Sequence, residues 1–258
     1  MILDEIVFNK RQEVTALKVH LKLPQAKKLI KQMPRTRKFA GQFPAGKISL
    51  IAEIKKASPS AGLLVKRYNP AALAKQYAKS GAAAISVLTD NKYFQGSIGH
   101  LAAVKKSVKL PVLRKDFIID SSQLYESRLA GADAVLLIVR ILTPQQLRDL
   151  LQLAGELGLE ALVETHDERE VAVALQAGAA CIGLNNRDLQ TLRIDLETSL
   201  MLLAKFPELK DKIVVAESGI KSAHDVQTLR SQGVRGILVG ESLLSSGDIP
   251  RKVKELLS

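Results

Sequence analysis

The most regular feature of the chain is a repeated unit in which an amphipathic stretch ends at a glycine and a short apolar run follows. Such junctions occur at Gly81, Gly131, Gly158, Gly178 and Gly233. Each glycine suits the left-handed position that ends a helix. Each run that follows is apolar at successive positions, as in a parallel strand that is buried on both faces. The repeat therefore predicts helices that alternate with buried parallel strands.

Apolar runs of this kind define eight candidate strands. They span about residues 49–54, 83–89, 110–115, 134–139, 160–165, 180–185, 213–217 and 236–240. Strands that alternate with helices in units of ~20–35 residues form parallel sheets with right-handed crossovers. Eight such units are the number that closes a barrel. The sequence therefore predicts an α/β fold, a (β/α)8 TIM barrel with an extra N-terminal helical arm.

An open doubly wound sheet is the alternative fold. Such sheets usually carry a glycine-rich turn after the first strand. Here the first strand ends in Glu53-Ile54-Lys55-Lys56, which favours the barrel.

Polar residues mark the expected helix starts. Asn69 and Thr143 each precede a proline, the order typical of an N-cap followed by the first helical residue. Three pairs have the spacing of a capping box: Thr143 with Gln146, Thr165 with Glu168, and Ser222 with Asp225. Apolar residues at near-helical spacing between Ile2 and Leu21 predict a helix before the first strand.

Composition excludes several classes of protein. The hydrophobic fraction of 47% is too high for a disordered chain, and Cys181 alone cannot form a disulfide scaffold or a multi-cysteine zinc module. No apolar run approaches the ~20 residues that a membrane-spanning helix needs. The acidic start, Met-Ile-Leu-Asp-Glu, lacks the basic residues of an export signal. We therefore expect a cytoplasmic protein that does not bind membranes.

The positive charge is concentrated near the N-terminus. The formal net charge is +12, and residues 1–47 hold 11 Lys and Arg against 3 Asp and Glu. The basic residues there are not interleaved with aromatic residues, which nucleic-acid-binding surfaces use to stack bases. We therefore expect no nucleic-acid partner. A plain solvated basic face is the commoner interpretation of the charge, and a small anionic substrate is the more informative one.

The predicted strands end in polar residues. Glu53 and Lys55, Lys115 and Asp116, Glu164, Asn185 to Arg187, and Glu217 with Ser218 all stand at such ends. Catalytic residues of these barrels lie at the C-terminal rim, where all strand ends meet. A structural ion-pair network is the alternative, but alternate strands each deliver a Lys or Glu to the same rim. The pattern therefore favours an active site.

Glycine turns after the last two strands indicate a phosphate site. Ser218-Gly219 and Gly240-Glu241-Ser242 can offer backbone N–H groups, and a short helix that starts near Glu241 would direct its positive end at an anion. Barrels commonly bind phosphate after strands seven and eight. The Glu241 side chain is then expected to point away from the anion.

These motifs resemble the indole-3-glycerol-phosphate synthase family of tryptophan biosynthesis. The segment from Ile51 to Gly62, IAEIKKASPSAG, is the most specific part of the resemblance. The resemblance continues through Leu113–Ile118, Leu162–Glu164, Gly183–Leu189 and Ala216–Ile220, and through the opening Ile2–Val7 with Lys10-Arg11. It spans essentially the whole chain. It implies one barrel domain, 1–258, with residues 1–47 as a helical extension over the barrel rim.

The resemblance also implies a reaction and its residues. The family converts 1-(2-carboxyphenylamino)-1-deoxyribulose 5-phosphate to indole-3-glycerol phosphate, carbon dioxide and water, as a carboxy-lyase. Lys115 is then the general acid, Lys55 holds the substrate carboxylate, and Glu164 serves the dehydration as acid or base. The remaining implied site residues are Glu53, Asn185, Glu217, Ser58 and Arg187, with Lys55, Ser218, Gly219, Gly240 and Glu241 at the phosphate.

Other features are expected to be structural. The four histidines show no metal-ligand spacing, and His166 and His224 fall in helix-cap segments where we expect surface positions. Cys181 lies in a predicted buried strand and is expected to act as a small hydrophobe. We expect no metal and no cofactor, and a monomer. The rival functions are another phosphate-binding barrel, such as phosphoribosylanthranilate isomerase or the tryptophan synthase α subunit, and a non-catalytic basic scaffold or nucleic-acid-binding protein.

Overall fold

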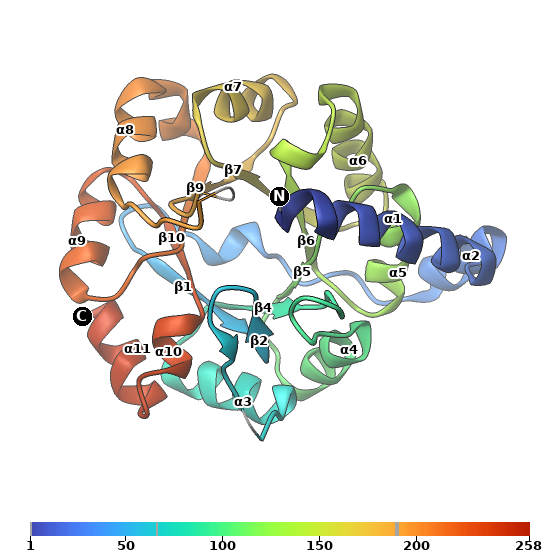
Figure 1. Ribbon diagram of the computed structural model, residues 1–258, viewed down its shortest axis with the longest axis horizontal. Coiled ribbons are helices and arrows are strands. Elements are labelled where there is room, and N and C mark those ends of the chain that lie inside the picture. Colours follow the sequence, from blue (N-terminus) through green and yellow to red (C-terminus); the bar gives the residue numbers. More distant parts are fainter. Residues whose placement is uncertain (1, 66, 189–190) are drawn as a thin grey trace.

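The computed structural model of the protein describes residues 2–65, 67–188 and 191–258. Eight parallel strands close into a barrel in the order β1-β10-β9-β8-β7-β6-β5-β4 (Figure 1). Their bounds are β1 Ser49–Ile54, β4 Ala84–Leu88, β5 Val112–Lys115, β6 Ala134–Ile138, β7 Glu160–Thr165, β8 Cys181–Asn185, β9 Ile213–Glu217 and β10 Gly236–Val239. The predicted TIM barrel is confirmed, and the doubly wound alternative is wrong, because β1 pairs with both β4 and β10.

Helices surround the barrel (Figure 1). They are α3 Pro70–Ser80, α4 Ile98–Ser107, α5 Ser121–Leu129, α6 Pro144–Glu156, α7 Glu168–Gln176, α8 Glu197–Lys205, α9 Ala223–Ser231, α10 Glu241–Leu244 and α11 Ile249–Leu257. Short 3-10 turns precede α6 (η2, Val139–Ile141) and β9 (η3, Pro207–Asp211). Buried residues of these helices pack against outward-facing strand residues in one continuous hydrophobic cluster. None of the helices described is long and apolar enough to span a membrane.

The local signals at helix ends are mostly confirmed. All five junction glycines have positive φ, from 74° at Gly158 to 103° at Gly81, and the capping boxes at Thr143 and Ser222 are present. The proposed box at Thr165 is wrong. Thr165 still belongs to β7, where its hydroxyl donates to the Gly183 carbonyl, and Asp167 caps α7 instead. A small hairpin of β2 (Ala57–Ser58) and β3 (Gly62–Leu63) was not predicted.

A second hydrophobic cluster fills the barrel interior. Its strand residues include Ile51, Leu113 and Leu162, and Phe39 and Phe43 belong to it. The two rings contact each other edge to face, with centroids 5.1 Å apart, and are buried. Phe43 packs against the first residue of β10, so the aromatic pair closes the N-terminal end of the barrel.

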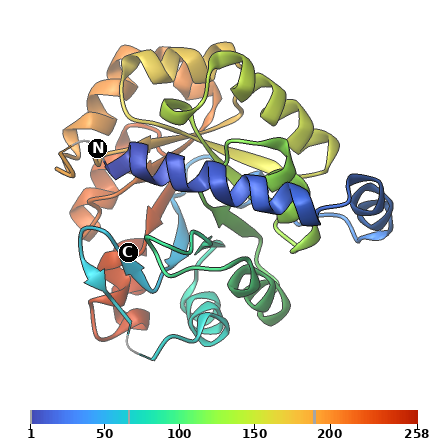
Figure 2. The ribbon, with the colours of Figure 1, turned by 45° about the vertical axis from the view of Figure 1, so that its right-hand side comes forward.

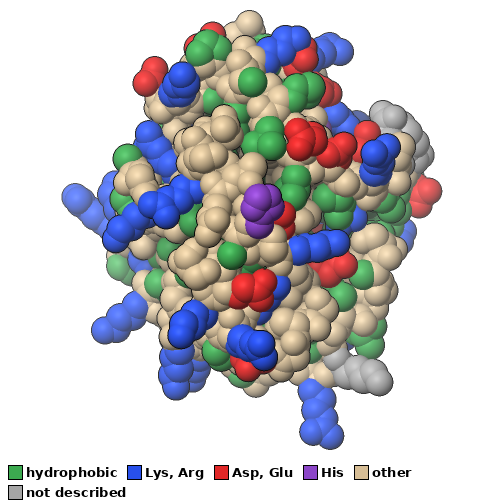
Figure 3. All heavy atoms as spheres, turned by 90° about the vertical axis from the view of Figure 1, so that its left-hand side faces the viewer, with side chains coloured by type: hydrophobic (Ala, Val, Ile, Leu, Met, Phe, Trp, Pro, Cys, Tyr) green, Lys and Arg blue, Asp and Glu red, His purple; other side chains and the backbone are tan. Residues whose placement is uncertain are grey.

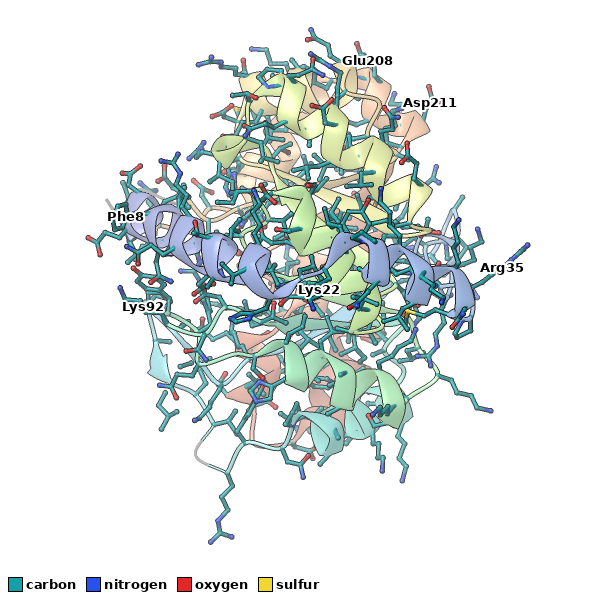
Figure 4. All side chains as sticks on the ribbon, turned by 90° about the vertical axis from the view of Figure 1, so that its right-hand side faces the viewer. Phe8, Lys22, Arg35, Lys92, Glu208 and Asp211 are labelled. Carbon is teal, nitrogen blue, oxygen red and sulfur yellow. The ribbon has the colours of Figure 1, made fainter. Side chains whose placement is uncertain are left out.

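Residues before β1 reach both ends of the barrel. Helix α1 (Ile2–His20) crosses the barrel mouth, and α2 (Leu23–Gln32) continues beyond it against α5 (Figure 2). Figure 4 shows this arm from the side, with Phe8 near one end, Lys22 between the helices and Arg35 at the far end. The chain then descends to the turn η1 (Ala40–Gln42) between the two phenylalanines. Arg37 secures this descent by donating to the carbonyls of Val108 and Leu110.

A buried lysine anchors α1. Lys10 is 2% exposed, and its Nζ lies 3.0 Å from Asp90 Oδ2 and 2.8 Å from Asp116 Oδ1. Burial opposes the charge of Lys10, but the carboxylates of Asp116 and Asp90 outweigh it and raise its pKa. The arm is therefore fixed to the loops after β4 and β5 by a paired charge that is excluded from water.

Candidate active site

A cavity of about 820 Å³ opens at the carboxyl ends of the strands, beneath α1. This is the end of the barrel at which such folds carry out chemistry. Every predicted site residue lines it: Glu53, Lys55, Ser58, Lys115, Glu164, Asn185, Arg187, Glu217, Ser218, Gly219, Gly240 and Glu241. Leu189, the last residue of one quoted motif, lies outside the described residues.

Two lysines and three carboxylates meet inside this cavity. Lys115, at the end of β5, places its Nζ 2.9 Å from Glu164 Oε2 and 3.3 Å from Glu217 Oε2. Lys55, just after β1, places its Nζ 2.7 Å from Glu53 Oε1. All five side chains are largely buried, because alternate residues at the strand ends point inward. The cavity therefore presents both proton donors and proton acceptors to one bound molecule.

The charges of this set control its protonation. Burial disfavours the ammonium of Lys115, but the carboxylates of Glu164, Glu217 and Glu53 outweigh it and raise its pKa well above its ordinary range. Burial likewise disfavours the Glu164 carboxylate, yet Lys115 and His166 hold the pKa of Glu164 well below its usual range. Lys115 is thus a protonated donor and Glu164 an ionised acceptor at neutral pH.

Glu217 behaves differently from its neighbours. Burial, opposed by Lys115 and reinforced by the negative charge of Glu164, raises its pKa to about 8. Lys115 lies at ion-pair distance, but neither carboxyl oxygen of Glu217 has a hydrogen-bond partner among the described residues. Two adjacent carboxylates beside one lysine form a coupled set that retains a proton.

The phosphate-site candidates lie at the ends of β9 and β10. Ser218 and Gly219 have φ values of 66° and 83°, and α10 begins at Glu241 directly after Gly240. A Cβ at residue 240 would lie 2.5 Å from Glu53 Oε1, so only glycine lets the backbone approach there. The Glu241 carboxylate is exposed and lies 3.8 Å from Arg187 Nη2.

The remaining candidates lie at the cavity edge. Ser58 belongs to β2, and its hydroxyl accepts from the Ala61 N–H. Asn185 ends β8, and its Oδ1 accepts from the Arg187 N–H at 3.0 Å. These contacts help to order the loops after β1 and β8 at the cavity mouth.

The sequence analysis missed an apolar wall in this cavity. Ile2, Leu3 and Ile6 of α1 line it together with apolar residues of the barrel end: Phe117, Leu136 and Leu238. The spacing of the α1 residues indicated a helix, and the family resemblance implied that it lies over the barrel rim, but neither showed that its apolar side chains line the cavity. The wall suits a planar aromatic group beside the charged set.

The expectation of a surface position for His166 is wrong. His166 is 8% exposed, and it lies between Glu164 and Glu170. His166 stands two positions after Glu164, directly beyond the last residue of β7, so the extended backbone directs both side chains to one side. That spacing, with Glu170 four residues later in α7, was the signal available in the sequence. Cys181 is buried as expected.

No group of three or more His, Cys, Asp or Glu in the described parts of the chain has an arrangement that could hold a metal ion. The predicted site residues supply lysine, arginine, carboxyl, amide, hydroxyl and backbone groups.

Comparison with known proteins identifies close relatives. The family model described as "Indole-3-glycerol phosphate synthase" matches residues 3–256. The protein of that name from Desulforamulus reducens is 46% identical over 258 residues, covering 100% of this chain and 97% of the relative. The one from Chlorobium chlorochromatii is 49% identical over 250 residues, covering 96% of each chain.

A solved structure shares the fold at low identity. The N-acetylmannosamine-6-phosphate 2-epimerase from Clostridium perfringens superposes with a TM-score of 0.64 at 15% identity, covering 86% of this chain and 97% of that one. At this identity the likeness extends to the barrel alone.

Proposed function

The chain belongs to the indole-3-glycerol phosphate synthase family, and from that premise we propose how its residues carry out the family's reaction. The enzyme closes the indole ring of 1-(2-carboxyphenylamino)-1-deoxyribulose 5-phosphate and releases carbon dioxide and water, a step of tryptophan biosynthesis. The observation that carries the assignment of residues is the convergence of Lys55, Lys115 and Glu164 in one cavity.

Lys115 acts as the general acid of ring closure. The aromatic carbon that bears the carboxylate attacks the ketone carbon, and the carbonyl oxygen becomes an alkoxide. An alkoxide is a stronger base than an amine, so it takes a proton even from an ammonium that three carboxylates stabilise. The raised pKa of Lys115 keeps that proton available throughout the working pH range.

Lys55 binds the substrate carboxylate until it leaves as carbon dioxide. Its ammonium is held by Glu53 at 2.7 Å, which leaves donor capacity for a bound anion because an ammonium has three N–H groups. The same lysine is near enough to the glycine turns to contribute positive potential at the phosphate, since Gly240 packs against Glu53.

Glu164 serves the dehydration. The closed ring must lose a proton and a hydroxyl group, and the departing hydroxyl leaves as water when it is protonated. An ionised carboxylate accepts the ring proton, and the resulting acid returns a proton to the hydroxyl. The lowered pKa of Glu164 matches the first of these steps, and the raised pKa of Glu217 provides a second, protonated carboxyl group nearby.

The other predicted residues orient the substrate. Glu53 and Glu217 direct the lysines and the sugar hydroxyls, and Asn185 positions the anilino nitrogen. Ser58 and Arg187 complete the binding site. Ser218, Gly219, Gly240 and Glu241 bind the phosphate through hydroxyl and backbone groups, in keeping with the positive φ angles and the start of α10.

We further propose a single barrel domain, 1–258, with residues 1–47 as its extension, that works as a cytoplasmic monomer without nucleic acid. On the face that Figure 3 shows, Lys and Arg side chains lie among Asp and Glu side chains. The isomerase rival requires a cysteine as acid or base, whereas burial holds the pKa of Cys181 far above its ordinary value.

The test is formation of the indole product from the carboxyphenylamino substrate, followed by its fluorescence. We expect Lys115→Ala to lower kcat at least about 100-fold, the lower limit of typical general acid catalysis, with an unchanged circular dichroism spectrum. Lys92→Ala is the matched control, since Lys92 is an exposed lysine on the loop after β4 (Figure 4), and it should keep full turnover. A Lys115→Ala enzyme with nearly full kcat would remove Lys115 from its role.

Glu164→Gln separates the two halves of the reaction. We expect this variant to accumulate a ring-closed, decarboxylated intermediate that still carries the hydroxyl, detectable by mass spectrometry of quenched reactions. Weaker substrate binding without any intermediate would make Glu164 a binding residue only. Failure of the unmodified enzyme to form any indole product would overturn the function itself.

A further inference from the structure

His166 is the one buried histidine that faces two carboxylates in the described part of the chain. Its Nδ1 lies 3.0 Å from Glu170 Oε2, and its backbone N–H donates to the same oxygen at 2.8 Å. Its Nε2 lies 3.2 Å from Glu164 Oε1, an ion-pair distance at which the N–H is not aligned as a hydrogen bond. The imidazole therefore links the start of α7 to the candidate catalytic carboxylate.

Only one protonation state suits both contacts. A neutral imidazole carries a lone pair on one ring nitrogen, and that lone pair would face a carboxylate oxygen at about 3 Å. The imidazolium has an N–H on both nitrogens, so it hydrogen-bonds Glu170 through Nδ1 and attracts the Glu164 carboxylate at ion-pair distance from Nε2. Two carboxylates at these distances therefore favour a positive charge on His166.

Glu170 is itself held from a third direction. Arg140 of η2 places its Nε 2.5 Å from Glu170 Oε1 and its Nη2 2.9 Å from Asp167 Oδ2. Positive and negative groups thus alternate from Arg140 through Glu170, His166 and Glu164 to Lys115. Charges in this order stabilise one another, and each member limits the movement of the next.

We propose that His166 is a positioning residue that orients the Glu164 carboxylate toward the substrate and favours its ionised form. This inference deepens the proposed function and rests on it, because it concerns how Glu164 becomes able to accept the ring proton. His166 itself needs no contact with the substrate. Glu164 Oε2 is fixed by Lys115 at 2.9 Å and Oε1 by His166, so the carboxylate has one defined orientation.

The electrostatics agree with this role. Burial opposes protonation of His166, but Glu164 and Glu170 outweigh it and raise the pKa of His166 to about 9. The charged groups around the ring are Glu164 on β7, Glu170 and Asp167 at the start of α7, and Arg140 on η2. The neighbouring strand β8, Cys181–Asn185, contributes no Asp, Glu, Lys, Arg or His. The imidazolium therefore persists across the neutral range.

A pH profile distinguishes positioning from mere packing. His166→Ala removes both the contact and the charge, and His166→Gln keeps a polar group of similar reach without the charge. We expect His166→Ala to lower kcat about 10- to 100-fold, a part of the 10²–10⁴-fold that acid–base catalysis supplies, with KM changed less than about threefold. The acid limb of kcat should move up by about one pH unit, because a cation that favoured the ionised carboxylate is gone.

His166→Gln should recover part of kcat while keeping the shifted acid limb. His224→Gln, which changes an exposed histidine of α9, is the matched control and should retain the kcat and pH profile of the unmodified enzyme. A His166→Ala enzyme with an unshifted acid limb would overturn the proposal, whether its kcat is unchanged or falls only together with its melting temperature. If Glu164→Gln is inactive but His166→Ala is fully active, the role of His166 is refuted and that of Glu164 stands. If Glu164→Gln is active, the role of Glu164, on which this inference rests, is refuted.

Discussion

Replacing Lys10 by methionine tests how the arm is held on the barrel. Methionine keeps an unbranched apolar side chain of similar length, so the change removes mainly the charge. Asp116 retains Arg114 and Thr89 as partners, whereas Asp90 Oδ2 has Lys10 as its only ion-pair partner among the described residues. The variant therefore leaves one carboxylate buried and uncompensated.

The size of the effect follows from that geometry. Removing one partner of a buried ion pair costs about 3–5 kcal/mol, and we expect about 3 kcal/mol because Asp116 stays paired. At ~2–4 °C per kcal/mol for a chain of this size, the melting temperature should fall by roughly 6–12 °C. Urea unfolding at pH 7, followed by circular dichroism, measures the free energy of unfolding directly.

The exposed pair in the same arm provides the control. Lys18 Nζ lies 2.6 Å from Asp120 Oδ2, but the lysine side chain is 56% exposed, so Lys18→Met should cost less than about 1 kcal/mol. Adding Asp90→Asn to Lys10→Met should recover at least about 1 kcal/mol, because the unpaired charge is then removed. Equal losses of unfolding free energy for Lys10→Met and Lys18→Met would show that the burial of the Lys10 ion pairs does not matter to stability.

The same variant has a pH signature. Burial opposes ionisation of Asp116, but Arg114 and Lys10 lower its pKa from 3.8 to about 2. A carboxyl group whose pKa is lower in the folded than in the unfolded state stabilises the fold when the pH is above its unfolded-state pKa. This stabilisation is lost as the pH falls toward the folded-state pKa. The difference in free energy of unfolding between Lys10→Met and the unmodified protein should therefore become smaller as the pH falls from 4 to 2.

Two further predictions concern the cavity. Because the pKa of Glu217 is raised to about 8, its burial destabilises the fold from about pH 4.5 upward and fully above pH 8. Glu217→Gln should therefore raise the melting temperature at pH 8 while it lowers kcat. A variant with a lower melting temperature than the unmodified protein at that pH would contradict this. A Cβ at Gly183 would collide with Glu217 Oε1, so Gly183→Ala should lower kcat by at least about tenfold through the displaced carboxyl group. Gly155→Ala on α6, where a Cβ meets nothing within 4 Å, is its control and should be neutral or slightly stabilising, and equal kcat values for these two alanine variants would contradict the prediction.

The sequence predicted the barrel well because each repeating unit carries its own signals. Junction glycines such as Gly131 and caps such as Thr143 act within a few residues, so neighbours in sequence suffice to place the helix and strand ends. Eight strands predicted a barrel, and catalytic residues of such barrels lie at the carboxyl ends of the strands, so the lysines and glutamates at those ends were candidates for the site. The family resemblance assigned their chemistry, which the geometry of the cavity supports.

Contacts between segments that are distant along the chain could not be predicted from the sequence. Phe39 and Phe43 looked like part of a basic arm, but their partners are strand residues that follow much later. His166 was expected at the surface because a histidine next to a helix start is usually exposed. Glu170 is only four residues away in sequence, but Arg140 reaches that carboxylate only in the folded structure. Lys10 could not be told from the other basic residues of the arm, because its partners Asp90 and Asp116 lie far from it in sequence.

The aromatic closure of the barrel has a consequence for synthesis in the cell. Phe39 and Phe43 leave the ribosome early, but Phe43 packs against Gly236, about 190 residues later in the chain. At translation rates of ~5–20 residues per second, the two rings wait roughly 10–40 s for that partner. Pairing of Ser49 with Gly236 closes the sheet over the same interval, which gives the nascent chain a high contact order. Until β10 emerges, Phe43 lacks this partner and the barrel end stays open, so chaperones can bind the two aromatic rings.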